Sequence, residues 1–175
     1  RLLGTHIAHA GILILLVGHV LTTTLVDRTD PSNFVTLERD VPTQHQGMEL
    51  VFTGVEVLSA DEQGYGYRIG DGYVGVVIEA RDVGGSLLGT ITPGMLRFDS
   101  PSGMVSARSE VDRLRGATGD TIVILDLLQS NELLSSMILG QTDDVSEVRV
   151  TVHRLQGSHL VWAGWLMVVI GSAFA

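Results

Sequence analysis

Hydrophobic residues fill the first part of the chain without interruption. Residues 2–26 contain no Asp, Glu, Lys or Arg. As a helix rising ~1.5 Å per residue, this segment would be about 37 Å long, more than the roughly 30 Å of a bilayer's hydrocarbon core. The uncharged run is too long for a signal peptide, and no small-residue cleavage site follows it. The pattern predicts a transmembrane helix within residues 1–27, which ends before Pro31 because proline cannot continue a helix.

Between residues 33 and 155 the pattern changes to short alternating runs. Val, Ile, Thr and Tyr are common there and Gly is frequent, which is typical of strands and turns. Val148, Val150 and Val152 alternate with polar residues, so one face of that strand should be buried. We predict an all-β domain over residues 28–157, closed as a small barrel or stacked as a sandwich. Its predicted strands are residues 48–58, 73–80, 87–92, 95–98, 104–111, 121–127 and 147–153.

Two local signals refine the β domain. The segment 81–87 places Asp82 and the pair Gly84-Gly85 between two predicted strands, which indicates a hairpin. Residues 131–139 carry apolar side chains at helical spacing behind Asn131, a residue type favoured as an N-cap. This second segment predicts a short helix or a loop that interrupts the sheet.

Hydrophobic residues return at the end of the sequence. Residues 160–175 are uncharged, and Trp162 and Trp165 fit an interfacial aromatic belt. A helix over this run would be ~24 Å long, shorter than a bilayer core. We therefore expect residues 158–175 to begin a second transmembrane helix of a longer membrane protein. Arg1 is a positive-inside signal, so the β domain of this multi-pass cell-membrane protein is expected outside the cytoplasm.

The composition excludes several functions. The net charge is −9, and all 11 basic residues are Arg, which argues against nucleic acid and against polybasic docking on anionic lipid. Cysteine is absent, so this chain has no disulfide, no thiolate metal site and no covalently attached c-type haem. The carboxylates of the β domain are scattered and no nucleophile motif occurs, so no catalytic residue is predicted.

Three histidines lie within the predicted N-terminal helix: His6, His9 and His19. An imidazole in hydrocarbon needs a hydrogen bond, a cavity or a metal to face. His6 and His9 fall about 60° apart on one side of the helix. Two interpretations stay open: the rings bond to neighbouring helices, or one is an axial ligand of haem iron. A bis-histidine haem also needs a histidine on a second helix, which this chain does not supply.

Small residues form a stripe on another face of the same helix, with His19 beside it. Gly4, Ala8, Gly11 and Gly18 make up this stripe, which would let another backbone or a flat ligand come close. We interpret His19 as a helix-contact residue.

Three further histidines lie outside this helix. We interpret His45 as a loop residue. His153 and His159 flank the second hydrophobic run, where capping or contact with solvent is expected.

Short motifs along the whole chain carry a family resemblance. Residues 4–11 read Gly-Thr-His-Ile-Ala-His-Ala-Gly, and residues 162–167 read Trp-Ala-Gly-Trp-Leu-Met. Between them lie Leu-Arg-Phe at 96–98, Pro-Ser-Gly-Met at 101–104 and Glu-Val at 110–111. In this order they resemble the C-terminal portion of the CcmF/CycK family, the membrane haem lyases of cytochrome c maturation. The chain departs from the family where Gln156, His159 and Leu160 replace a proline, a basic residue and a tryptophan.

The resemblance implies a role for two of the histidines. CcmF-like proteins receive haem from the chaperone CcmE and attach it to apocytochrome c, working with CcmH-type thiol components. They also hold a structural haem b between two transmembrane histidines. By position His9 would be one ligand of that haem iron, with His6 one turn away in a hydrogen-bonding or packing role. The family's Trp-rich haem-handling segment is absent, so this piece is not expected to be catalytic alone.

Two other functions remain open. A haem b electron-transfer subunit of the membrane would use the same histidine chemistry without attaching haem to a protein. A membrane-anchored β domain that only binds partners would use the histidines for helix packing. Only the haem lyase requires a Trp-rich external segment elsewhere in the protein.

Overall fold

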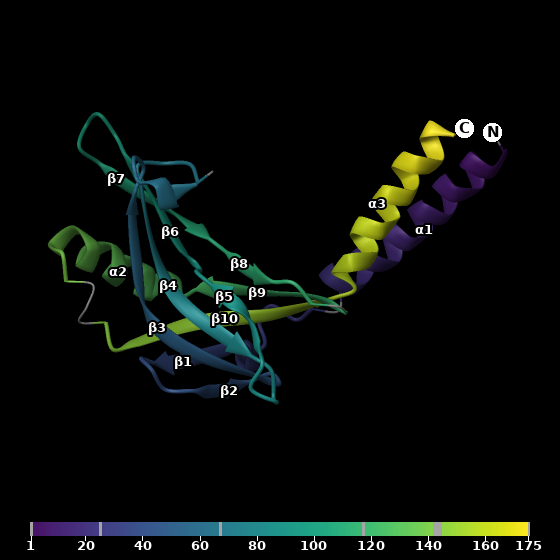
Figure 1. Cartoon of the computed structure of the whole chain (residues 1–175). Helices are drawn as coiled ribbons and strands as arrows, with labels where there is room; N and C mark the ends of the chain where they lie inside the picture. Colours follow the sequence, from purple (N-terminus) through teal and green to yellow (C-terminus); the bar gives the residue numbers. More distant parts are fainter. Residues whose placement is uncertain (1, 25, 67, 117, 142–144, 175) are drawn as a thin grey trace. The chain divides into compact units, whose positions relative to one another are not determined.

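The computed structural model describes residues 2–24, 26–66, 68–116, 118–141 and 145–174 (Figure 1). The chain divides into two compact units. The helical unit comprises residues 1–30, 115–122 and 153–175, and the β unit comprises residues 31–114 and 123–152.

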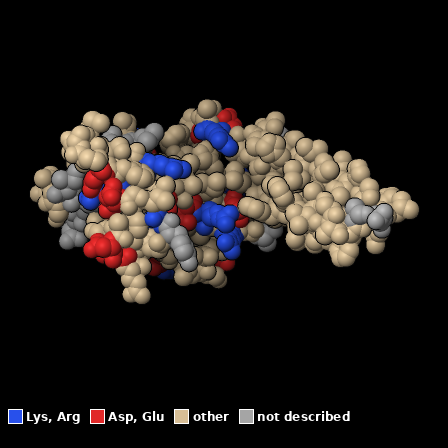
Figure 2. All heavy atoms as spheres, turned by 90° about the horizontal axis from the view of Figure 1, so that it is seen from above, with Lys and Arg blue, Asp and Glu red and all other residues tan. Residues whose placement is uncertain are grey.

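Two apolar helices form the helical unit, α1 (Leu2–Thr23) and α3 (Ser158–Ala173). They lie side by side and antiparallel, with both chain ends at the same end of the pair (Figure 1). Within the described residues, α1 is the one helix long and apolar enough to cross a membrane, and α3 is apolar but shorter. Neither helix contains a charged residue, and the face of the pair visible in Figure 2 shows none.

Glycines at seven-residue spacing make the contact between the two helices. Gly4, Gly11 and Gly18 are the buried residues of α1, and Gly164 and Gly171 lie opposite them on α3. A Cβ built on Gly11 would lie 2.8 Å from the carbonyl oxygen of Gly164, and one on Gly164 would lie 2.6 Å from that of Gly11. No side chain fits at such distances, so only glycine allows the two backbones to touch. The predicted stripe of small residues is therefore occupied by the backbone of α3.

Replacing Gly164 by Leu should weaken the helix pair, because the new side chain would overlap the backbone of α1. Overpacking of this kind typically destabilises a protein by about 1–3 kcal/mol. The measurement is the free energy of unfolding of the chain in detergent micelles, by titration with SDS. Leu166→Ala is the matched control, because Leu166 lies on the exposed side of α3 and is 60% exposed. Equal stability of the Gly164→Leu chain and the wild type would contradict the backbone contact.

The β unit is built around two sheets (Figure 1). One sheet has the strand order β1-β10-β9-β8, and the other has β2-β3-β4-β6-β7 with β5 also paired to β4. The N–H of Asp40 donates to the carbonyl oxygen of Phe52 at 2.8 Å, which joins the two sheets on one side. The arrangement is a half-barrel, between the two alternatives expected from the sequence. The strands are β1 (Phe34–Glu38), β2 (Thr43–His45), β3 (Met48–Ser59), β4 (Gly72–Arg81), β5 (Leu87–Ile91), β6 (Gly94–Asp99), β7 (Val105–Glu110), β8 (Asp112–Leu114), β9 (Gly119–Leu125) and β10 (Glu147–Gln156).

The core lies between the two sheets and draws on both. The alternation predicted for β10 is confirmed, because Val148, Val150 and Val152 are fully buried. Phe52 is the largest side chain fully buried in this core, and Leu133 of the helix α2 (Leu127–Leu139) packs into it at 3% exposure. Two short 3-10 helices, η1 (Pro31–Asn33) and η2 (Gln63–Tyr65), complete the elements.

Each of the seven predicted strands is present, with end points that agree with the structure or differ from it by at most three residues. The predicted hairpin at 81–87 is also present: the N–H of Asp82 donates to Ser86 O at 2.9 Å, and Gly85 has a positive φ of 83°. The short strands β1, β2 and β8 were not predicted. They contain only three to five residues each, too few to show a period along the sequence.

The prediction of a helix or loop starting at Asn131 was wrong about its first residue. Helix α2 begins at Leu127, and the carboxylate of Asp126 accepts the N–H of Leu128 at 2.8 Å, as an N-cap does. Asp126 also pairs with Arg149 of β10 at 2.5 Å. The cap itself is a local feature, because Asp is as favoured an N-cap as Asn, whereas its ion pair with Arg149 joins residues distant in sequence.

A second, smaller cluster covers the other face of the larger sheet. It contains Tyr65, Tyr73 and Leu96. The hydroxyl of Tyr73 donates to the carbonyl oxygen of Thr92, and the Arg68 guanidinium lies 4.2 Å from the centre of the Tyr73 ring. Burial raises the pKa of Tyr73 to about 12.

The raised pKa of Tyr73 predicts a loss of stability in alkali. The phenol should ionise near pH 10 when the chain is unfolded but only near pH 12 when it is folded. Stability is therefore complete below pH 10 and falls as the pH rises towards 12, by up to about 2.7 kcal/mol for two pKa units. Urea unfolding at a series of pH values from 8 to 11.5 measures this loss. Tyr73→Phe should show a smaller loss over this range, and an unchanged pH dependence would refute the assignment.

Candidate functional site

Two histidines project from the face of α1 that lies away from α3. His6 and His9 are both exposed, whereas Gly4, Gly11 and Gly18 on the packed face are buried. At ~100° per residue, His9 lies roughly 160° around the helix from the mean direction of these glycines. The glycine contact therefore fixes which side of α1 presents the two imidazole rings.

Each of these rings is held by a bond to its own helix. The Nδ1 atom of His9 lies 2.7 Å from the carbonyl oxygen of Thr5, and Nδ1 of His6 lies 2.6 Å from that of Leu2. A carbonyl oxygen can only accept, so Nδ1 is the donor in these bonds, and in a neutral imidazole Nε2 then keeps its lone pair. Metal-binding histidines commonly donate their second N–H in this manner, which fixes the tautomer and the ring orientation.

The metal that the sequence suggests for this face of α1 is haem iron. Within the described part of the chain, no three His, Asp or Glu side chains come together to hold a metal ion. A haem needs less from one chain segment, because the macrocycle supplies the in-plane ligands and the protein adds axial ones. The exposed imidazole of His9 can serve as such an axial ligand, because its Nδ1 is bonded to the helix and its Nε2 is the nitrogen left for iron. The same holds for His6.

His19 differs in its place on the helix. Its side chain is exposed, but at ~100° per residue it lies only about 80° from the glycine stripe, nearer to α3 than the other two rings. Its backbone carbonyl oxygen accepts the hydroxyls of Thr22 and Thr23, at 3.2 and 2.6 Å. This position agrees with the interpretation of His19 as a residue beside the helix contact.

The remaining histidines follow the sequence expectations only in part. His159 is exposed, as expected. His153 is 8% exposed, so the expectation of solvent contact or capping was wrong. Its burial lowers its pKa, and the positive charge of Arg28 lowers it further. His45 ends the short strand β2, and burial lowers its pKa too, against a smaller opposing effect of a bond to the Asn33 backbone.

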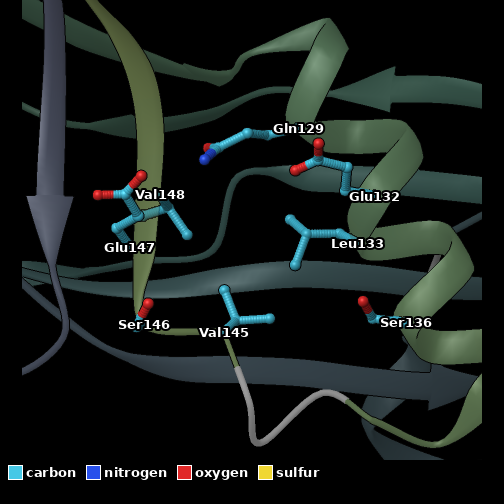
Figure 3. A pocket seen from close by; sticks show the side chains of 8 residues that line it. All are labelled: Gln129, Glu132, Leu133, Ser136, Val145, Ser146, Glu147 and Val148. Carbon is cyan, nitrogen blue, oxygen red and sulfur yellow. The ribbon is translucent and has the colours of Figure 1, made fainter.

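The β unit has a pocket of about 230 Å³ between α2 and the start of β10 (Figure 3). No histidine lines it, so its two serine hydroxyls have no imidazole base beside them. The lining combines acceptor oxygens with apolar groups and gives no set of catalytic residues. The lining residues are Gln129, Glu132, Leu133, Ser136, Val145, Ser146, Glu147 and Val148.

The fold and the site together define a class of protein. One chain contains a β half-barrel and a close pair of apolar helices, and one of these helices exposes two histidines whose rings are bonded to its backbone. A solved structure named Cytochrome c Heme Lyase CcmF has the same fold, with a TM-score of 0.60 and 15% sequence identity. The likeness covers 98% of this chain and 24% of CcmF, so the chain spans about a quarter of that protein's length. No protein-family model matches the sequence, and no curated protein sequence matches it either.

The resemblance to CcmF that the sequence motifs predicted is thus confirmed by the fold. The likeness runs over both helices and the β unit in one chain order. This likeness is one of backbone fold, and it does not assign a role to His9 or His6.

Proposed function

We propose that this chain is part of a CcmF-like membrane protein that handles haem in cytochrome c maturation, with His9 as one axial ligand of a haem b. The observation that carries the proposal is the hydrogen bonding and exposure of the His9 ring. Its Nδ1 donates to the Thr5 carbonyl oxygen at 2.7 Å, and among the described residues its Nε2 has no hydrogen-bond partner on the exposed side of α1 opposite α3.

The residues of this chain would have distinct tasks at such a haem. His9 would give its Nε2 lone pair to the iron, and the Thr5 carbonyl would hold the ring in one orientation. His6 lies one turn away with the same internal bond, to Leu2, and would contact the edge of the group or a neighbouring helix. When bound, the haem would supply a one-electron redox couple tuned by its axial ligands.

The other parts of the proposal follow from the likeness to CcmF. Helices α1 and α3 would belong to a multi-pass protein of the cell membrane, with the β domain of residues 28–157 outside the cytoplasm. There the β domain would meet the haem chaperone CcmE, a CcmH-type thiol component and apocytochrome c. The agreement of fold over 98% of the chain supports this assignment over a haem b electron-transfer subunit, which has the same ligand chemistry.

The test is the absorption spectrum of the intact protein that contains this chain, purified in detergent with haem quantified per polypeptide. The wild type should show a low-spin b-type spectrum. His9→Ala should lose most of the haem or convert it to high spin, because the iron loses an axial ligand. His19→Leu is the matched control, since it removes an imidazole from another side of the same helix and should leave the haem content unchanged.

Identical spectra of the wild type and His9→Ala would show that His9 is a packing residue and that the protein is a binding module. A loss of haem in His19→Leu would likewise contradict the assignment. Covalent haem attachment to a co-expressed apocytochrome c then separates the two haem functions: an electron-transfer subunit would keep its spectrum but mature no cytochrome.

A further inference from the structure

Strand β7 is a free edge of the larger sheet. It pairs with β6 on one side, and no described strand pairs with its other side. Four successive residues, Val105 to Arg108, are exposed. Because successive side chains point to opposite faces, both faces of the strand are uncovered there. Free edges offer unpaired N–H and C=O groups to other chains, and β7 lacks the lysine or proline that often protects them.

The pairing with β6 shows which backbone groups point outward. The N–H of Ser100 donates to Met104 O at 2.8 Å, and the same register continues along both strands from Asp99↔Val105 to Gly94↔Glu110. In an antiparallel ladder, hydrogen-bonded and non-hydrogen-bonded pairs alternate. The N–H and C=O groups that face away from β6 are therefore those of Val105, Ala107 and Ser109. These three are spaced as an added strand requires.

A groove of about 480 Å³ adjoins this edge, within the range of ~300–1,000 Å³ typical of ligand sites. Arg108 and Glu110 lie on the same face of β7, two residues apart, and Arg108 pairs across the ladder with Leu96. The groove thus combines an apolar floor with charged walls. It is lined by Arg68, Ile69, Leu96, Arg108, Glu110 and Val111, with Ser109 alongside.

Polar atoms in the groove are held in place but incompletely bonded. Arg68 stacks on Tyr73 and donates to the carbonyl oxygens of Gly64 and Tyr65, at 3.4 and 3.3 Å. Its Nε lies 3.7 Å from Oε1 of Glu110, an ion pair too long for a hydrogen bond. Nε of Arg68 and Oε2 of Glu110 are both buried, and neither has a hydrogen-bond partner among the described residues. The groove wall therefore contains one buried donor, Arg68 Nε, and one buried acceptor, Glu110 Oε2, without a hydrogen bond.

Arg108 adds an uncompensated positive charge at the mouth of the groove. It is exposed, and it forms no ion pair with any described carboxylate, although Arg97 pairs with Asp99 at 3.1 Å on the neighbouring strand. In a chain of net charge −9, an unpaired arginine here favours an anionic ligand.

We propose that β7 and this groove bind an extended polypeptide, which adds a strand along the outer edge of β7. An acidic side chain of the peptide pairs with Arg108, and an apolar side chain two residues away packs against Val111, which is 50% exposed. A small anion would satisfy the arginines but leave the outward groups of Val105, Ala107 and Ser109 unpaired. The inference goes beyond the haem proposal and does not depend on His9.

The test uses the full chain in detergent micelles and a fluorescein-labelled eight-residue peptide in which Thr alternates with Val and Asp. Binding is followed by fluorescence anisotropy. The wild type should bind this peptide, and Ala107→Pro should bind it at least about 10-fold more weakly, because proline removes the outward N–H. No bond to β6 is lost in this variant. Ala107→Thr keeps the N–H and is the matched control, with unchanged affinity expected.

A second arm tests the charge. Arg108→Gln should lower the affinity for the acidic peptide by about 3- to 10-fold, in line with an exposed ion pair and a charge-assisted hydrogen bond. It should not change the affinity for the same peptide with Asn in place of Asp.

Several outcomes would overturn the inference. They are a wild type that binds no peptide, an Ala107→Pro chain that binds as well as the wild type, and equal binding of a peptide whose alternate amides are N-methylated. The last comparison uses only the wild-type chain, so it holds even if a variant fails to fold. Binding of glutarate without binding of peptide would show a small-anion site instead. If the intact protein that contains this chain lacks haem but still binds the peptide, the haem proposal is refuted and this inference stands.

Discussion

The backbone contact between α1 and α3 is the constraint on which the candidate site depends. Three glycines of α1 and two of α3 repeat every seven residues, so the same faces meet over the whole length of both helices. Van der Waals contact of two backbones can drive helix association in lipid, where apolar side chains gain little from leaving their surroundings. This contact occupies one face of α1 and thereby leaves the opposite face, with His6 and His9, open to another helix or to a cofactor. One face of α1 is therefore packed against α3, and the opposite face presents the two imidazoles.

The β unit shows a comparable division between a closed and an open side. On one side the N–H of Asp40 joins the sheets through Phe52, and the valines of β10 fill the space between them. On the other side the larger sheet ends at β7 with unpaired backbone groups beside a groove. A half-barrel has such an edge by construction, whereas a closed barrel has none. The same core that makes the unit stable thus leaves one strand available for a partner.

Local sequence patterns predicted the features that depend on neighbouring residues. Alternation gave the long strands and the buried face of Val148, Val150 and Val152, and turn chemistry gave the hairpin after Arg81. The start of α2 was misplaced because Asp126 and Asn131 are both residue types favoured as an N-cap, and residue type alone did not choose between them. The burial of His153 was missed because alternation along β10 puts it on the wet face, whereas its side chain is buried and the charge of Arg28, distant in sequence, acts on it.

The sequence by itself determined the uncharged N-terminal helix, the all-β class of the middle segment, the histidines and the likeness to CcmF, because each is written in residue types and short-range spacing. Only the tertiary structure decided that α3 covers the glycine face of α1, so that His6 and His9 lie on its open side, and that β7 is left unpaired at the edge. These depend on which distant segments pack together, and on which surfaces that packing leaves free. Contacts between distant residues arise from the balance of burial and hydrogen bonding over the whole chain, and no local pattern encodes that balance.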